Sequence, residues 1–206
     1  MTREADPQWR PTAQRIAPQE PDEWDDDARA ALAPTPERFA ELRDAAPGER
    51  PLHILTTLAH HGPLLRAFLP FSATLTLRGR LPRRDAEIAA LRASWNCRSE
   101  FEWGHHRLYA QAAGLDDAEI EAIAGDIESD RWSPHEAVLL RAADELHHEH
   151  DLSEATWNAL SSHYDEAQCI ELLFTVGQYA TLSWITNALR IPLEPHLEGL
   201  PRARPR

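Results

Sequence analysis

Apolar residues recur at intervals of three or four along most of the chain, and the strict alternation typical of strands is scarce. The last long segment shows this spacing clearly, because its apolar and small residues fall on one helical stripe. The members of that stripe are Ile170, Leu173, Phe174, Gly177 and Thr181. The periodicity predicts an all-α protein. The expected helices span residues 23–32, 36–45, 52–60, 63–78, 82–95, 99–113, 116–125, 133–149, 153–163 and 165–189.

Helix start signals support this pattern at two places. Ser133 is followed by Pro134 and Glu136, which combines an N-cap residue, a proline in the first turn and a capping-box acid. Asp116 and Glu119 have a similar N-terminal arrangement. These signals support the helices expected over residues 116–125 and 133–149.

Prolines set the two ends of the chain apart from its middle. Residues 1–22 hold four prolines among few apolar residues, which predicts an arm or wrap rather than a core element. Residues 196–206 are also interrupted by proline and end in arginines, which predicts a solvated tail. We therefore expect one helical domain over residues 23–195, large enough to bury a core.

An excess of acidic residues limits the classes of partner. The chain has 21 Lys and Arg against 34 Asp and Glu, a net charge of −13, whereas nucleic acids and anionic membrane surfaces attract basic patches. No apolar run approaches the roughly 20 residues of a membrane-spanning helix, and no apolar N-terminal stretch indicates secretion. Cys97 and Cys169 form no close-spaced motif, so we expect a reduced, cytoplasmic protein with a small-molecule partner.

The stretch EFEWGHH, residues 100–106, concentrates proton-handling and metal-binding side chains within one predicted helix. Glu102 and His106 lie four residues apart and share a face, so the carboxylate can orient the imidazole or both can contact one ligand. Glu87 lies one turn before Leu91, at the edge of an apolar stripe. Partial burial at such an edge would suit this carboxylate for proton transfer.

Each of these residues also has a purely structural interpretation. Ser99 and Glu102 form the S-x-x-E pattern of a capping box, in which the carboxylate reaches back to the backbone N–H of Ser99. Glu87 can form an ion pair with Arg83 or Arg84 one turn earlier. A lone helical histidine is more often structural than functional.

A metal site is a further alternative. The spacing E-x-x-H occurs twice, and carboxylate-bridged di-iron bundles use this spacing on two of their helices. The residues concerned are Glu102, His105, Glu145 and His148, with Glu87 and Glu171 as additional carboxylates. With 34 acids and 11 histidines in the chain, some such pairs are expected by chance.

One segment resembles a known family. Residues 81–115 read LPRRDAEIAALRASWNCRSEFEWGHHRLYAQAAGL and are similar to the carboxymuconolactone decarboxylase family, which shares its fold with the alkyl hydroperoxidase D proteins. The likeness extends over residues 20–195. In the peroxidase branch a glutamate precedes a C-x-x-C-x-x-x-H motif by twelve residues. The matching positions, without a gap, are Glu87, Ser99, Glu102 and His106.

The resemblance departs from this motif at both cysteines, because Ser99 and Glu102 stand in their places. Dithiol peroxide reduction needs one thiolate to attack and a second to resolve the intermediate. We therefore expect no dithiol peroxidase activity from this motif. Two carboxylates and an imidazole, suited to moving protons, remain at Glu87, Glu102 and His106.

The resemblance implies an alkyl hydroperoxidase D-like helical bundle and an acid/base enzyme of decarboxylase type that needs no cofactor. Decarboxylation, dehydration or isomerisation of a small organic acid or lactone requires proton transfer at a developing enolate, which His106 would perform. Glu102 would orient the imidazole and Glu87 would act as the second acid or base. The residues expected in the substrate pocket are Ser99, Trp95, Trp103 and Tyr179, with Arg92 or Arg107 as the cation for an anionic substrate.

Proteins of this kind commonly form homo-oligomers, so the resemblance also implies a dimer, trimer or hexamer, with the apolar helix at 63–77 as a candidate interface. A non-catalytic ligand-binding or oligomerisation module with the same fold is the remaining alternative, because a fold does not by itself establish activity. The residues alone do not identify the substrate or the reaction.

Overall fold

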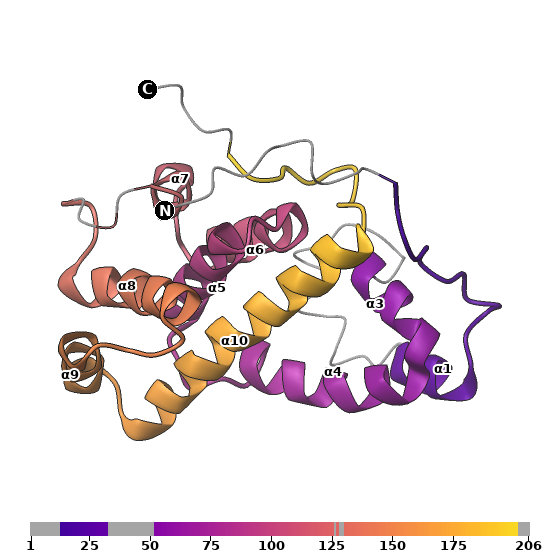
Figure 1. The fold of residues 1–206 in the computed structure, drawn as a ribbon, viewed down its shortest axis with the longest axis horizontal. Helices are drawn as coiled ribbons and strands as arrows, with labels where there is room; N and C mark the ends of the chain where they lie inside the picture. The colour runs from indigo at the N-terminus through magenta and orange to yellow at the C-terminus, as the bar shows by residue number, and fades with distance from the viewer. Residues whose placement is uncertain (1–12, 33–51, 126, 128–129, 202–206) are drawn as a thin grey trace.

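The fold is known from a computed structural model, which describes residues 13–32, 52–125, 127 and 130–201. Those residues form helices and connecting segments, as the periodicity predicts (Figure 1). The helices are α1 Asp26–Leu32, α3 His53–Leu58, the 3-10 turn η2 Ala59–His61, α4 Gly62–Thr76, α5 Arg83–Asn96, α6 Glu100–Ala112, α7 Asp117–Ile123, α8 Pro134–His148, α9 Glu154–His163 and α10 Glu166–Leu189. The helix predicted over residues 36–45 lies outside the described residues.

Local capping explains why several helices begin where they do. The side chain of Ser133 accepts a hydrogen bond from the backbone N–H of Glu136, and Glu136 reaches back to the cap, so the predicted capping box of α8 is present. Asp116 and Glu119 form the same box at α7. Each box satisfies backbone N–H groups that the first helical turn would otherwise leave unpaired.

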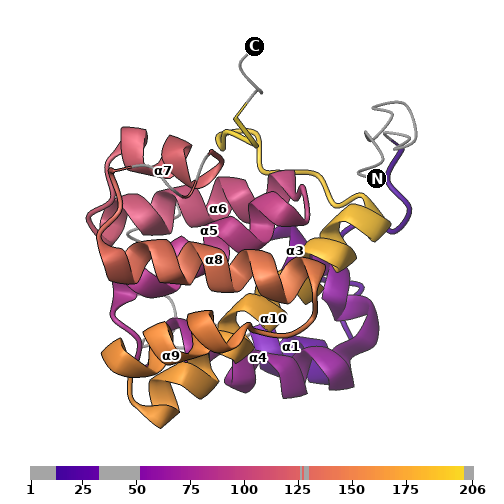
Figure 2. The same ribbon diagram turned by 60° about the vertical axis from the view of Figure 1, so that its left-hand side comes forward.

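Helix α5 lies at the centre of the bundle, packed against α6, α8 and α10 (Figure 2). Its small residues Ala89, Ala90 and Ala93 are buried, and they let neighbouring helices approach closely while Ile88 and Leu91 fill the core between them. Helices α1, α3 and α4 lie together on the right of Figure 1. Among the described helices, none combines the length and the apolarity that crossing a bilayer requires.

The chain after α10 lies across α6. A Cβ built on Gly104, in the middle of α6, would lie 2.8 Å from Cδ1 of Leu193 and 3.0 Å from the carbonyl oxygen of Glu198. The backbone N–H of Leu200 donates to the carboxylate of Glu100, at 2.7 Å. Residues 191–200 therefore cover α6 closely enough to require glycine at the crossing, where a helix interior otherwise disfavours it by about 1 kcal/mol.

Candidate active site

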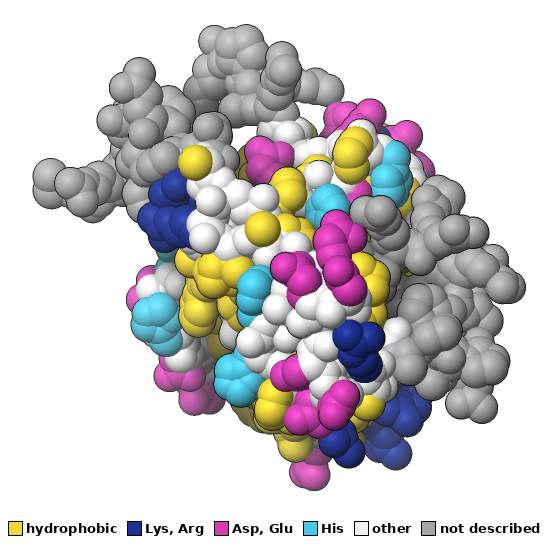
Figure 3. Space-filling view, turned by 90° about the vertical axis from the view of Figure 1, so that its right-hand side faces the viewer, with side chains coloured by type: hydrophobic (Ala, Val, Ile, Leu, Met, Phe, Trp, Pro, Cys, Tyr) yellow, Lys and Arg dark blue, Asp and Glu magenta, His cyan; other side chains and the backbone are white. Residues whose placement is uncertain are grey.

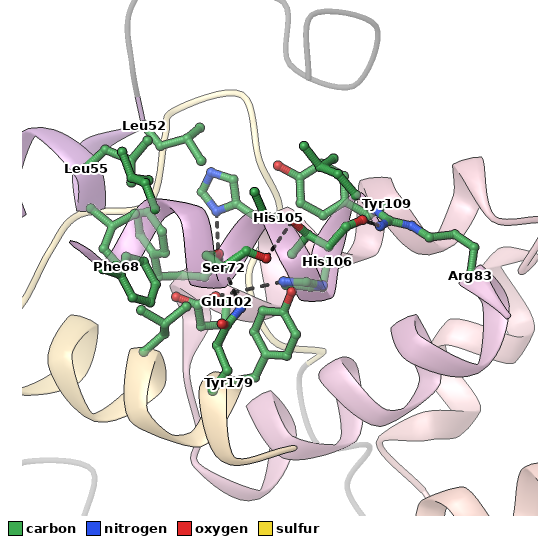
Figure 4. A pocket seen from close by; sticks show the side chains of 18 residues that line it. Leu52, Leu55, Phe68, Ser72, Arg83, Glu102, His105, His106, Tyr109 and Tyr179 are labelled. Atoms are coloured by element: carbon green, nitrogen blue, oxygen red, sulfur yellow. Dashed lines mark hydrogen bonds and ion pairs between the residues drawn. The ribbon is translucent and has the colours of Figure 1, made fainter. Parts of the chain in front are cut away.

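A pocket of about 140 Å³ lies between α3, α4, α6 and α10. Figure 4 shows apolar side chains on one side of this pocket, among them Leu52, Leu55 and Phe68, and polar side chains on the other. The residues on the polar side are Arg83, Glu102, His105, His106, Tyr109 and Tyr179. The histidine and one of the carboxylates of the predicted site thus line a common cavity.

The imidazole of His106 is held in one orientation from behind the pocket. Its Nδ1 lies 2.6 Å from Oε2 of Glu87 on α5, and both side chains are buried. Because a carboxylate can only accept, Nδ1–H is the donor, which leaves Nε2 as the nitrogen directed away from Glu87. Two tyrosine rings also pack against the imidazole in edge-to-face geometry, with centroids 4.1 Å away for Tyr179 and 5.3 Å away for Tyr109.

Glu87 connects the histidine to an arginine. Its second oxygen, Oε1, lies 2.9 Å from a guanidinium nitrogen of Arg83 one turn earlier on α5. The same guanidinium donates to the backbone carbonyl of Thr76 at the end of α4. The ion pair considered for Glu87 therefore exists together with the contact to His106, and each carboxylate oxygen has its own partner.

Glu102 faces the other ring nitrogen. Its Oε2 lies 4.0 Å from Nε2 of His106, and its Oε1 is buried without a hydrogen-bond partner. Burial raises the pKa of Glu102, and the neighbouring His106 and His105 only partly offset this effect. A carboxyl group in this environment favours the protonated form, which can donate a hydrogen bond.

The helix cap does not occupy the Glu102 side chain. Ser99 accepts a hydrogen bond from the backbone N–H of Glu102, at 3.2 Å, which is one half of the predicted capping box. The other half is missing, because the backbone N–H of Ser99 donates to the carbonyl of Ser94 at 2.9 Å. The carboxyl group of Glu102 is therefore available to the pocket.

A second pair of buried groups borders the pocket. Nδ1 of His105 donates to the backbone carbonyl of Phe101 at 2.9 Å, and its Nε2 forms an ion pair with Oε2 of Glu194 at 3.0 Å. Burial opposes the charged imidazole, but Glu194 and the Phe101 carbonyl raise the pKa of His105 overall. Burial also opposes the charged carboxylate, yet His105 and the backbone N–H of His53 lower the pKa of Glu194.

The structure brings Glu87, Glu102 and His106 close together, from α5 and α6. The sequence assigns the orienting role to Glu102, whereas Glu87 makes the short contact to the imidazole. Glu87 lies behind His106 and is absent from the pocket lining, whereas Glu102 is part of that lining. The carboxyl group of Glu102, one turn before His106 on α6, lies 4.0 Å from the other ring nitrogen.

Three of the residues expected in the pocket lie behind its wall. Trp103 is 1% exposed and packs in the core against Trp95, with ring centroids 6.0 Å apart. Ser99 is fully buried and its hydroxyl lies 3.1 Å from that of Thr186. Tyr179, by contrast, lines the pocket as expected.

The two arginines considered for an anionic substrate lie elsewhere. Arg92 makes two contacts of 2.6 Å with the carboxylate of Asp144. Arg107 forms ion pairs with Asp117 and Glu198 on the surface. The arginine that does line the pocket is Arg83, which the sequence suggests only as a partner for Glu87. Glu194 offers no sequence signal, because no motif or periodicity marks it.

The alternative metal site is contradicted by the positions of its residues. Glu145 accepts hydrogen bonds from the backbone N–H of Ser153 and the hydroxyl of Thr156, at the start of α9. His148 is exposed, and its Nδ1 donates to the carbonyl of Asp144. Within the described ranges, no group of three or more His, Cys, Asp or Glu side chains is arranged to hold a metal ion.

Comparison with solved structures shows a shared fold. An uncharacterised peroxidase-related protein from Ralstonia eutropha JMP134, described as an alkylhydroperoxidase AhpD core, aligns with a TM-score of 0.73 and 19% identity, over 90% of this chain and 94% of that chain. A peroxidase-related protein from Silicibacter sp. TM1040 aligns with a TM-score of 0.73 and 16% identity, over 92% and 95%. The debrominase Bmp8, in complex with 2,3,4-tribromopyrrole, aligns with a TM-score of 0.68 and 15% identity, over 89% and 93%.

Sequence comparison locates the family signal in the central helices. The sequence model of the carboxymuconolactone decarboxylase family matches residues 62–145, a range that contains Glu87, Glu102 and His106. A search of curated proteins found no match to the chain. The chain therefore has an AhpD-like helical fold, and its central segment, residues 62–145, matches the carboxymuconolactone decarboxylase family.

Proposed function

We propose that this protein is an acid/base enzyme that transfers a proton within a small molecule bound in the pocket, with His106 as the group that takes and returns the proton. The observation that carries the proposal is the 2.6 Å contact between Nδ1 of His106 and Glu87, which directs Nε2 toward Glu102 beside the cavity. A general base needs a fixed ring and a lone pair that the substrate can reach.

The roles follow from the contacts of each group. Glu87 holds the ring and stabilises the imidazolium that forms when Nε2 accepts a proton, as a carboxylate behind a histidine does in other acid/base sites. Glu102, whose pKa is raised by burial, supplies a proton or hydrogen bond to the oxygen on which negative charge develops. The same parts serve decarboxylation, dehydration or isomerisation of a small organic acid or lactone.

Hydrogen exchange on a simple ketone tests the proposal and does not require the natural substrate. We expect the protein to accelerate the exchange of the α-hydrogens of cyclohexanone in D₂O above the buffer rate, followed by ¹H NMR. His106→Ala should lose this acceleration, since the base is removed. Glu119→Gln, which alters a carboxylate paired with Arg84 away from the pocket, is the matched control and should keep it.

The outcome against the proposal is equally specific. If His106→Ala is folded and exchanges the ketone as fast as the unaltered protein, His106 is not the base. If the unaltered protein does not exceed the buffer rate, while cyclohexanone binds in the pocket, the proton-transfer assignment fails.

A non-catalytic ligand-binding module is the second candidate. One observation favours it: much of the pocket lining is apolar, and the unpartnered Oε1 of Glu102 would suit a bound ligand as well as a reacting one. A ligand that saturates the unaltered protein and His106→Ala with equal affinity, with no turnover in either, would support binding without catalysis.

A further inference from the structure

The charges that face the pocket are already paired within the protein. The guanidinium of Arg83 is matched by Glu87 at 2.9 Å and by the carbonyl of Thr76. The imidazole of His105 is matched by Glu194 at 3.0 Å. An organic anion entering the pocket would therefore lose its hydration without meeting an unmatched cation among the described residues, which is a costly transfer.

The remaining polar groups suit a neutral oxygen instead. Oε1 of Glu102 is buried without a partner beside Nε2 of His106, and a protonated carboxyl group donates to a carbonyl or hydroxyl oxygen. Leu69, Leu77 and Leu182 extend the apolar side of the cavity. A carboxylate placed next to Glu102 would stabilise the protonated acid further but gain no ion pair from it.

We propose that the pocket takes an uncharged, largely apolar molecule with one carbonyl oxygen, a ketone or lactone, and excludes organic anions. This inference rests on the proposed function for its choice of site. It narrows the reaction to isomerisation or dehydration, because decarboxylation starts from a carboxylate that this pocket does not stabilise.

The proton-transfer step balances without any further reactant. Nε2 of His106 removes a proton from the carbon next to the carbonyl, and the electron pair of the broken C–H bond forms the C=C bond of an enol. The carbonyl π pair takes the proton of Glu102. Return of the His106 proton to the same or a conjugated carbon, and of the enol O–H proton to Glu102, completes the isomerisation and restores both groups.

Paired probes with the same six-membered ring test the charge preference. The full chain is titrated with cyclohexanone and with cyclohexanecarboxylate, and binding is followed through the imidazole ¹H–¹⁵N signals of His106. We expect the ketone to bind at least about tenfold more tightly than the carboxylate, with a Kd near 1 mM for so small a probe. Equal binding, tighter binding of the carboxylate, or no ketone binding up to about ten times that concentration overturns the inference.

A variant tests the cause of the preference. Glu87→Gln removes the side-chain carboxylate that neutralises Arg83. We expect the ratio of the two Kd values to shift in favour of cyclohexanecarboxylate by about tenfold or more. Glu119→Gln, away from the pocket, should leave the ratio unchanged. An unchanged ratio in Glu87→Gln overturns the argument from paired charges. Binding is measured separately from proton transfer. The preference for the neutral probe can therefore hold when the proposed proton transfer fails, and the proton transfer can hold when the preference fails.

A separate observation concerns the outer face of α10. Ile170, Phe174 and Trp184 are each more than half exposed, at 56%, 53% and 61%, and Phe71 of α4 contacts Phe174 edge to face. From Leu172 to Leu189 the helix contains no charged residue, although charged residues make up 27% of the chain. A helix face in water normally carries charges.

This uncharged face is prominent in the figures. Helix α10 crosses the front of the molecule in Figure 1, and none of the other described helices lies over it in that view. On the side formed by α1, α3 and α4, by contrast, acidic, basic and histidine side chains are interspersed among the apolar ones (Figure 3). At on the order of 100 Å² for each large apolar side chain, Phe71, Ile170, Leu173, Phe174 and Trp184 supply about 500 Å², more than half of the roughly 800 Å² that each partner buries in a standard interface.

The spacing along the face indicates what covers it. Five exposed residues along the face are separated by three, four, four and three positions. Gly177 is the middle residue, so the intervals read the same from either end of the series. The series is Ile170, Leu173, Gly177, Thr181 and Trp184. A Cβ built on Gly177 would meet nothing within 4 Å, so another helix can approach closely there. An antiparallel copy of the same helix would match this series residue for residue.

We propose that the α10 face binds a second copy of this chain about a two-fold axis at Gly177, with Ile170 of each copy against the aromatic ring at position 184 of the other. The absence of charge on this face avoids the repulsion that two copies of net charge −13 would otherwise experience. The contact is isologous and therefore closes as a dimer.

Sedimentation velocity of the full chain tests this contact. We expect the unaltered protein to sediment as a dimer or an even multiple, and Gly177→Glu to halve that mass, because two carboxylates would meet at the axis. Ser161→Glu on the exposed side of α9 places the same charge elsewhere and should not change the mass. A monomeric unaltered protein, or an unchanged mass in Gly177→Glu, overturns the proposal.

Disulfide cross-linking tests the position of the axis. Both native cysteines are buried, so Gly177→Cys adds one accessible thiol per chain. We expect mild oxidation to join two chains through this position, since equivalent residues at a two-fold axis come within the Cα separation of a disulfide, about 4.4–6.8 Å. Ser161→Cys should remain uncross-linked. Failure of Gly177→Cys to cross-link places the axis elsewhere and overturns the arrangement.

Discussion

Oε2 of Glu87 lies 2.6 Å from Nδ1 of His106, although the two residues are on different helices and nineteen positions apart in the chain. The contact fixes which nitrogen of the ring carries hydrogen, because Glu87 can only accept. It also couples the imidazole to Arg83 through the second oxygen of Glu87. The tautomer of His106 is therefore set from behind the pocket by Glu87, which does not line the cavity.

Glu87→Gln should change that tautomer while keeping the shape of the side chain. An amide can donate its N–H to Nδ1, which would place the ring proton on Nε2 and remove the lone pair that acts as the base. We expect kcat for ketone exchange to fall by about 10² to 10⁴, with little change in KM for the neutral ketone. The ¹⁵N shifts of the imidazole report the tautomer directly. Unchanged shifts and rate would contradict the role given to Glu87.

The pH dependence of kcat/KM should report Glu102. Burial raises its pKa above the ordinary 4.5, so its acid form persists at pH values where an exposed glutamate is ionised. Because the acid form is the donor, exchange should be fastest below this raised pKa and decline as the pH rises through it. Glu102→Gln cannot ionise and should lose that decline. The same decline of kcat/KM at high pH in both proteins would show that another group causes it.

The pair of His105 and Glu194 should make stability depend on pH in two directions. The lowered pKa of Glu194 gives stability that is present above 4.5 and lost as the pH falls through the lowered value. The raised pKa of His105 gives stability that is present below 6.5 and lost as the pH rises through the raised value. The pair therefore contributes most to the free energy of unfolding at pH values between the lowered pKa of Glu194 and the raised pKa of His105.

Urea unfolding of Glu194→Gln checks this window. We expect the variant to lose about 3 kcal/mol in the free energy of unfolding between those pKa values, because the His105 imidazolium would be left buried without its carboxylate. The loss should shrink in more acidic and more alkaline solution. Glu198→Gln is the control on the same segment, and its exposed pair with Arg107 should matter by less than about 1 kcal/mol. A pH-independent loss in Glu194→Gln would exclude titration of the pair.

Arg92 should matter for stability and not for substrate binding. It is 8% exposed, contacts Asp144 twice at 2.6 Å and also donates to the backbone carbonyl of Ile123. We expect Arg92→Met to lower the free energy of unfolding by about 3 kcal/mol and to leave KM for the ketone unchanged in the folded protein. Arg66→Met removes an exposed pair with Asp27 and should cost less than about 1 kcal/mol. A raised KM in Arg92→Met would indicate that Arg92 contributes to substrate binding.

The sequence predicts the helices well because their signals are local. Capping at Ser133 and Asp116 and the periodicity of α10 each lie within one helix, and the structure places the helices there. The pairing of Glu87 with Arg83 is also local, at i, i+4. The nearness of Glu87 to His106 follows from the family spacing and not from periodicity, because the two belong to different helices.

The contents of the pocket could not be predicted in the same way. Trp95 and Trp103 are aromatic residues near the site in sequence, but the packing of α5 against α6 turns them into the core. Glu194 reaches His105 across 89 positions, from a segment without helical periodicity. Such contacts depend on how the chain after α10 crosses the bundle, and no short pattern in the sequence encodes that path.

The crossing at Gly104 gives the carboxyl-terminal segment a part in building the site. Leu193 lies where a larger residue at position 104 would have its Cβ, and Glu194 follows it directly, against His105. Deleting the chain after Leu189 would thus strip one carboxylate from the pocket border and uncover a bare glycine in α6. Shortened versions of this protein, or fusions that displace the segment, would carry an altered site even with every helix intact.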